Sequence, residues 1–120
     1  VRLYVEKAKE AMADAEFSFR NKRFSNCTNR LYYSLFYAIS ALFVKDSVPV
    51  SSHAGVKSKF GELYVKTGVF DASDAKVFSQ MATLREKSDY NCYFKVTEDE
   101  LNEKMPKANA LIEKIMAVVN

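Results

Sequence analysis

The segment from Asn26 to Phe43, NCTNRLYYSLFYAISALF, is the feature that most constrains the fold. Its apolar residues recur at helical spacing on two adjacent faces, formed by Cys27, Leu31, Leu35, Ala38 and Leu42 and by Tyr32, Phe36, Ile39 and Phe43. A helix with so little polar surface needs neighbours on most sides. The segment therefore predicts the central helix of a bundle.

Arg30 is the one charged residue between Arg23 and Lys45. An unpaired guanidinium is costly to remove from water, so we expect Arg30 to have an anion beside it.

Length and composition favour one helical domain. A chain of 120 residues is long enough for one sizeable core and too short for two, so a single domain is expected over residues 1–120. Only three glycines and two prolines are present. Few turn residues predict short connections, which favours an all-α fold.

The first half of the chain contains two helices that pair with each other. Residues 1–20 form an amphipathic helix, and the polar residues 21–23 join it to a second helix over 24–45. The short connection predicts an antiparallel helical hairpin. Pro49 then fixes an extended connector.

A short third helix follows the connector. Ser51 or Ser52 caps it, it reaches Val65 or Lys66, and Gly68 supplies its stop.

Two longer helices complete the chain. The fourth begins within residues 71–74, where acidic side chains favour a helix N-terminus, and runs to Tyr90. Thr97 and Glu100 form a capping box for the fifth, which ends near the last residues. Pro106 lies inside this helix and is expected to kink or split it.

Charge, cysteines and hydropathy narrow the class of protein. A net charge of +3 is too small to imply nucleic-acid binding by itself, although residues 1–66 hold 11 Lys and Arg against 6 Asp and Glu. Cys27 and Cys92 lack metal-binding spacing, so buried reduced thiols and no metal or cofactor are expected. A highly charged N-terminal segment and the lack of a membrane-length apolar run predict a cytoplasmic protein. Because the chain starts at Val1 without a methionine, the sequence allows for residues upstream.

Polar groups at core-facing positions are the candidate functional residues. On the second helix, Asn26, Arg30, Tyr33 and Tyr37 share one face, and on the fourth helix Arg85 and Asp89 extend the apolar stripe. Asp89 meets the negative end of its helix dipole and needs a cation beyond Arg85, for which Arg30 is available.

Two interpretations of this cluster stay open. A buried Arg30–Asp89 ion pair would fix the register of two helices. Alternatively, Arg30, Arg85 and the tyrosines face a cleft that binds phosphate, because guanidinium groups bind phosphate oxygens bidentately and tyrosine rings stack on bases.

His53, the one histidine, starts the third helix with Lys57 one turn later on the same face. The pattern suits cap-region packing, and more weakly an anion site.

Three segments, NRLYYSLFYAISALF, SHAGVKSKF and LREKSDY, in this order and spacing resemble the HEPN domain family. The resemblance covers nearly the whole chain. It implies an up-and-down bundle of four or five helices that is usually a homodimer. It also implies a partner, because such domains are often encoded beside a minimal nucleotidyltransferase and the two act as a toxin and antitoxin.

Many HEPN members are metal-independent ribonucleases with an Arg, four to six residues and then a His near a helix end. Here the resemblance places the Arg at Arg85, and Tyr90 stands where the His is expected. Tyrosine, with an ordinary pKa of about 10, is a poor general base at neutral pH. His53 could replace it only if the third helix brings it to the cleft.

Three hypotheses follow. In the first, a HEPN protein binds the phosphate of a nucleotide or RNA around Arg85, with Arg30, Tyr33, Asp89, Tyr90 and Lys57, and works with a nucleotidyltransferase. In the second, it is a metal-independent ribonuclease that uses Arg85 with Tyr90 or His53. In the third, it is a non-catalytic dimerisation module whose cluster is a buried ion-pair network. The sequence leaves open whether the protein is an enzyme.

Overall fold

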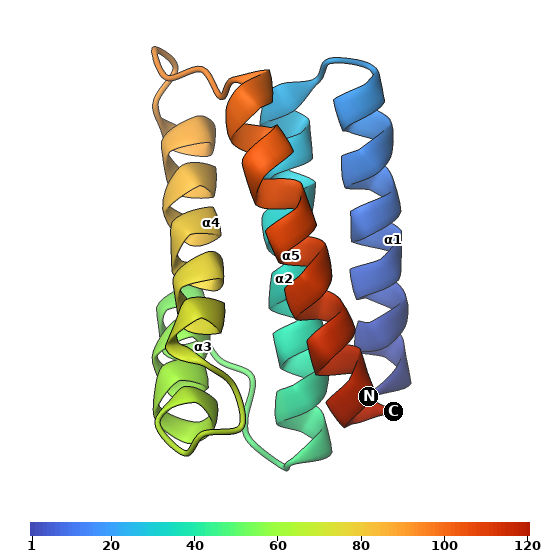
Figure 1. Cartoon of the computed structure of the whole chain (residues 1–120), viewed down its shortest axis with the longest axis vertical. Coiled ribbons are helices and arrows are strands. Elements are labelled where there is room, and N and C mark those ends of the chain that lie inside the picture. Colours follow the sequence, from blue (N-terminus) through green and yellow to red (C-terminus); the bar gives the residue numbers. More distant parts are fainter.

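A computed structural model describes all residues 1–120 and shows five α-helices without strands. The helices are α1 (Arg2–Arg20), α2 (Phe24–Lys45), α3 (His53–Phe60), α4 (Ala72–Tyr90) and α5 (Glu98–Val119), and one π-helical turn, η1 (Gly61–Val65), continues α3. The long helices alternate in direction, and the two ends of the chain lie close together (Figure 1). The predicted up-and-down bundle is confirmed.

The helix boundaries follow local sequence signals. Ser52 caps α3, with its hydroxyl accepting a hydrogen bond from the backbone N–H of Gly55 at 3.2 Å. The carboxylate of Asp74 accepts one from the backbone of Asp71 at 2.9 Å, and Thr97 and Glu100 form the predicted capping box of α5. These contacts satisfy helix N–H groups that have no partner within the helix.

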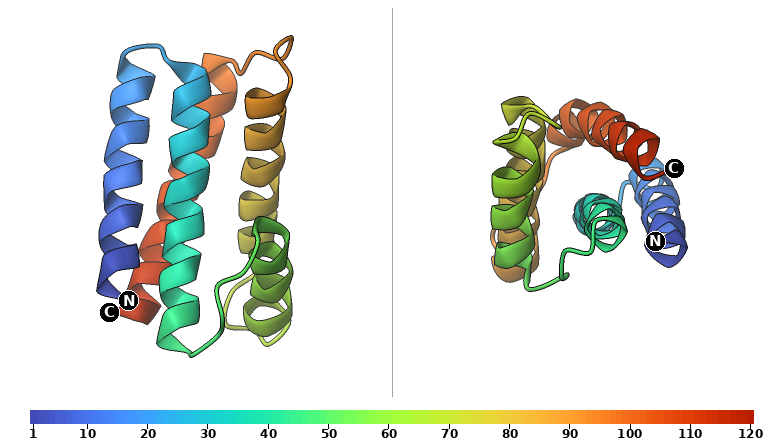
Figure 2. Two further views of the ribbon diagram at one scale, coloured as in Figure 1. Left: turned by 180° about the vertical axis from the view of Figure 1, so that it is seen from behind. Right: turned by 90° about the horizontal axis from the view of Figure 1, so that it is seen from below.

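Helix α2 is the central helix of the bundle. Twelve of its 22 residues are buried, and its buried hydroxyl groups donate to the helix backbone, for example Ser34 to Leu31 and Ser40 to Phe36, both at 2.7 Å. Viewed along the bundle, α1, α5 and the pair of α3 and α4 surround α2 on three sides (Figure 2). The fourth side, opposite α5, carries no helix.

Two details of the fold differ from the expectations. Helix α5 continues through Pro106, so the predicted split is wrong. Pro106 and Asn102 are both exposed, so water can solvate the Asn102 carbonyl that loses its intrahelical partner. Cys27 is buried as predicted, but Cys92 is exposed because it lies in the loop after α4.

None of the helices combines the length and apolar character that a bilayer crossing requires.

Candidate functional site

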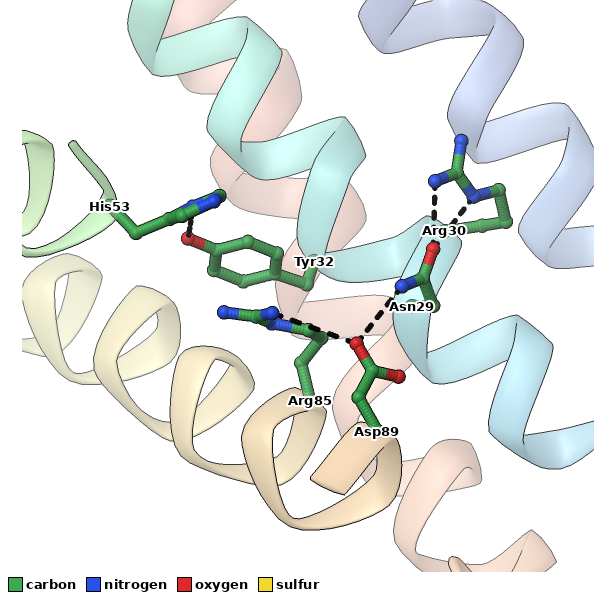
Figure 3. Close-up of polar contacts among 6 residues, drawn as sticks. All are labelled: Asn29, Arg30, Tyr32, His53, Arg85 and Asp89. Atoms are coloured by element: carbon green, nitrogen blue, oxygen red, sulfur yellow. Dashed lines mark hydrogen bonds and ion pairs between the residues drawn. The ribbon is translucent and has the colours of Figure 1, made fainter. Parts of the chain in front are cut away.

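Three helices meet at a small cleft that contains three of the predicted site residues, Arg85, His53 and Lys57. Its volume is about 320 Å³, and we call it the Arg85 cleft. The cleft is lined by Tyr32 of α2, by His53, Ala54, Lys57 and Ser58 of α3, and by Ala82, Arg85 and Glu86 of α4. Figure 3 shows its central polar contacts.

Arg85 is a buried cation with few partners. Only 5% of the residue is exposed, and its guanidinium carbon lies 4.7 Å from the centre of the Tyr32 ring. Its one ion pair is with Asp89, at 3.6 Å from Nη1 to Oδ2, and its buried Nε has no hydrogen-bond partner in the chain. An arginine offers five N–H donors, so Arg85 has unused capacity to bind an anion.

Tyr32 connects α3 to the Arg85 cleft through a contact with His53. Its ring is buried and stacks on Phe78 at 5.7 Å, and its hydroxyl lies 2.8 Å from Nδ1 of His53. Burial raises the pKa of Tyr32 to about 12, so its hydroxyl stays protonated at neutral pH. The contact holds His53, the first residue of α3, at the edge of the cleft that contains Arg85 (Figure 3).

His53 favours its neutral form. Burial lowers the pKa of His53 below its usual value, the positive charge of Arg85 acts in the same direction, and Glu86 opposes both. A neutral imidazole near pH 7 can accept a proton, which is the property a general base requires.

Tyr90 is poorly placed for the same task. It is the last residue of α4, it is 79% exposed, and it does not line the Arg85 cleft. Its ring centre lies 5.8 Å from the guanidinium carbon of Arg85, so the ring covers the arginine from outside.

Arg30 does not pair with Asp89, and this prediction is wrong. Its Nε and Nη2 donate to Oδ1 of Asn29 at 3.0 and 2.7 Å, and its guanidinium carbon lies 5.2 Å from the Tyr33 ring centre. Asn29 in turn donates to Asp89 at 3.2 Å, so an uncharged side chain separates the two charged ones (Figure 3). Arg30 is only partly buried, so water can solvate its charge without an ion pair.

The comparison with known proteins fits this arrangement. The model of the HEPN domain matches residues 1–118. The chain belongs to the HEPN domain family. Its relatives include a Thermotoga maritima UPF0332 protein, 29% identical over 99% of this chain and 90% of that protein. A Methanocaldococcus jannaschii protein with the name "Putative toxin MJ0605" is 28% identical over 96% of this chain and 85% of that protein.

A second M. jannaschii relative, "Putative toxin MJ0142", is 23% identical over 92% of this chain and 75% of that protein.

In this HEPN domain, Tyr32 and Glu86 line the cleft, and Asn29 contacts Asp89, the ion-pair partner of Arg85, although the sequence singles out none of the three as a site residue. A tyrosine among apolar residues on a central helix is typical of core packing, and no spacing pattern marks Asn29 or Glu86. Lys57 lies on the cleft wall as the helical spacing from His53 predicted. Tyr33 flanks the site, with its ring centre 5.7 Å from that of His53 and 6.0 Å from the guanidinium carbon of Arg85.

Larger grooves of the HEPN domain are weaker candidates. The largest, about 570 Å³, lies between α4 and α5. Two of its three lysines are paired, Lys114 with Asp74 at 2.6 Å and Lys107 with Glu103 at 3.2 Å, and no buried cation lines it. No group of three or more His, Cys, Asp or Glu side chains in the chain is arranged to hold a metal ion.

The lowered pKa of His53 predicts a pH dependence of stability. The unfolded chain binds a proton at this histidine more tightly than the folded one. The free energy of unfolding should therefore fall as the pH drops from about 6.5 toward the lower pKa of the folded state. The expected loss is below about 1 kcal/mol, because solvent screens the partly exposed ring. Urea unfolding measures the free energy of unfolding at pH 8 and at pH 5. The difference between these two values should be smaller for His53→Gln than for wild type, and equal differences would contradict the prediction.

Proposed function

We propose that this HEPN domain binds the phosphate of RNA or of a nucleotide in the Arg85 cleft. The observation that carries the proposal is the buried guanidinium of Arg85, which has an unpartnered Nε and a single ion pair at 3.6 Å. Lys57 adds a second positive charge on the cleft wall, and Ser58 adds a hydroxyl donor. Guanidinium groups bind phosphate oxygens bidentately, so a phosphate fits the free donors of Arg85.

The proposal includes a toxin-like role in a two-protein system. Its support is the HEPN membership and the two relatives whose names contain the word toxin. We propose a cytoplasmic homodimer that acts together with a minimal nucleotidyltransferase. A nucleotidyltransferase gene beside this one, and co-purification of its product with this chain, are the expected observations. Light scattering tests the dimer.

Equilibrium titration of wild-type protein with a fluorescent single-stranded RNA oligonucleotide tests the binding step. Affinity should fall as salt rises, because phosphate contacts release counterions. Inorganic phosphate and a mononucleotide serve as competitors to separate recognition of phosphate from recognition of the polymer. If RNA, phosphate and nucleotide all fail to bind at low salt, the proposal is wrong.

Lys57→Gln should weaken RNA binding modestly. The substitution removes one charge from the cleft wall, so the slope of log affinity against log salt should decrease by about 1. Lys59→Gln on the same helix is a matched control, because Lys59 does not line the Arg85 cleft. Identical slopes for wild type and Lys57→Gln would show that Lys57 does not contact the phosphates of the ligand.

A specific observation also favours a second function, metal-independent RNA cleavage. His53 lines the cleft that contains Arg85, whereas Tyr90, at the position of the family's histidine, is turned to solvent. The cleft therefore combines a phosphate-binding arginine with an imidazole. Incubating wild-type protein with labelled RNA in excess chelator tests this function, and intact RNA after prolonged incubation would exclude it.

A further inference from the structure

A line of aromatic side chains crosses α2 from α1 toward α3. It consists of Tyr4 of α1 and of Tyr33, Phe36 and Tyr37 of α2, and we call it the aromatic row. Neighbouring ring centres are 6.3 Å apart for Tyr4 and Tyr37, 5.8 Å for Tyr37 and Tyr33, and 6.1 Å for Tyr33 and Phe36. The four rings thus form one continuous aromatic surface.

This surface lacks a covering element. All four residues of the aromatic row are only partly buried, although α2 is the central helix of the bundle. The row runs across α2 from Tyr4 of α1, which lies beside Tyr37, to Phe36, which lies beside His53 of α3. Figure 2 shows no helix on the side of α2 opposite α5, between α1 and the pair of α3 and α4. Aromatic side chains that extend over a contiguous surface of this kind are typical of binding sites.

Positive charge accompanies the row along its length. The Lys7 Nζ lies 5.4 Å from the Tyr37 ring centre, and the Arg30 guanidinium carbon lies 5.2 Å from that of Tyr33. Neither cation has a salt-bridge partner, because Arg30 donates to the uncharged Asn29. The surface therefore offers ring faces together with uncompensated cations, which suits a polyanion that carries flat bases.

The row is continuous with the Arg85 cleft. The His53 ring centre lies 4.9 Å from that of Phe36 and 5.7 Å from that of Tyr33, and Tyr33 also approaches Arg85. A chain molecule with one phosphate at Arg85 would thus extend onto the aromatic row. Arg30 and Lys7 lie along the same direction, toward α1.

We propose that the aromatic row is a stacking platform for the bases of single-stranded RNA, and this rests on the proposed binding of an RNA phosphate at Arg85. Single strands fit because their unstacked bases can turn toward tyrosine and phenylalanine rings. In an RNA duplex the same faces are occupied by neighbouring bases. The row would thus make the site selective for single strands and tolerant of sequence, because every base has a π face.

The test compares two oligonucleotides of equal length. One carries 2-aminopurine beside ordinary bases, and the other is abasic at the same positions and keeps every phosphate. Wild type should bind the base-bearing strand more tightly and quench 2-aminopurine fluorescence. Tyr37→Leu should lose about tenfold in affinity for that strand, because stacking on one ring is worth about 1–3 kcal/mol. Its affinity for the abasic strand should stay at the wild-type level.

Three controls make the test decisive. Tyr37→Phe keeps the ring and should bind like wild type, whereas an affinity as low as that of Tyr37→Leu would contradict stacking. Phe17→Leu removes an exposed aromatic ring of α1 that is not part of the row, and it should bind like wild type. Thermal melts monitored by circular dichroism confirm that Tyr37→Leu is folded before its affinity is interpreted.

Failure of this inference is distinguishable from failure of the proposed function. If wild type binds both strands equally and without quenching, phosphate binding stands and the stacking platform is wrong. If wild type binds neither strand, the proposed function itself is wrong. A wild-type dimer that Tyr37→Glu converts to a monomer, with no quenching of 2-aminopurine, would show that a second copy covers the row, and would overturn the inference.

Discussion

Replacing Arg85 with methionine is expected to abolish most RNA binding and to leave the bundle folded. The guanidinium is the one buried cation of the cleft, and it has free donors for a phosphate. Removing one partner of a buried charged hydrogen-bonded pair typically costs about 2–5 kcal/mol of binding energy, or roughly 30-fold to several thousandfold in affinity. Fluorescence anisotropy with a labelled RNA oligonucleotide measures the change.

Arg85→Met should not lower the free energy of unfolding. Arg85 has lost its hydration, and in exchange it has one carboxylate at 3.6 Å and the face of the Tyr32 ring at 4.7 Å, so the folded state bears part of its desolvation cost. Methionine has a similar length and no charge, and replacing buried ions with apolar side chains is often neutral or stabilising by about 1–4 kcal/mol. Urea unfolding should therefore give an unfolding free energy for Arg85→Met at or above that of wild type.

Arg20→Met provides the matched control for this prediction. Arg20 is exposed in the last turn of α1, so its replacement removes the same charge without touching the cleft. Its RNA affinity should stay within a few fold of wild type. If Arg85→Met and Arg20→Met bind RNA equally well, the ligand does not sit at Arg85. If Arg85→Met unfolds, the arginine contributes to stability in a way that these contacts do not explain.

The fold was predictable because each helix carries its own local signals. Apolar spacing defined α2, Ser52 and Thr97 marked helix starts, and Gly68 marked the end of the helical segment. The π-helical turn after Phe60 was not predictable, since the hydrophobic pattern does not distinguish it from an ordinary helical turn. For a small helical bundle, local chemistry determines the elements, and their packing follows from the apolar faces.

The site was predictable only where helical periodicity placed residues on a common face. Arg85 and Asp89 on α4, and Lys57 one turn after His53 on α3, follow from that spacing, and the fold brings α3 and α4 together at the cleft. The pairing of Arg30 with Asp89 was mispredicted because a helix with so few polar residues predicts neighbours on most of its sides and thus a desolvated Arg30. The side chain is only partly buried, so water solvates the charge and the uncharged Asn29 suffices as a partner. Which side of a central helix stays open depends on how its neighbours pack, and one sequence does not encode this locally.

If the protein cleaves RNA, His53→Gln is expected to slow cleavage by about 10²–10⁴-fold, the usual contribution of a general base. The imidazole accepts the proton of a 2′-hydroxyl, whose oxygen forms a bond to phosphorus. The bond from phosphorus to the 5′-oxygen breaks, and that oxygen takes a proton from water. The products are a 2′,3′-cyclic phosphate and a 5′-hydroxyl, and neither a metal ion nor another reactant is needed.

Tyr32 contacts Nδ1 of His53, which leaves Nε2 as the nitrogen available to a substrate. When Nδ1 carries the proton and donates it to the Tyr32 oxygen, 2.8 Å away, Nε2 is the nitrogen that accepts. Tyr32→Phe should therefore lower the rate less than His53→Gln does and should change its pH profile, because Tyr32 positions the ring without exchanging the proton. A purely structural role for this hydroxyl would lower stability and leave the profile unchanged.

Tyr90→Phe separates the two candidate proton acceptors. It removes the hydroxyl of an exposed ring and keeps the cover over Arg85, so cleavage with His53 as the base should continue near the wild-type rate. The assay is denaturing electrophoresis of labelled RNA in chelator. Arg85→Met serves as the inactive reference. An RNA with 2′-deoxyribose at the cleavage position lacks the attacking hydroxyl, so neither wild type nor any variant should cleave it. Loss of cleavage in Tyr90→Phe with retention in His53→Gln would assign the proton transfer to Tyr90 despite its exposure.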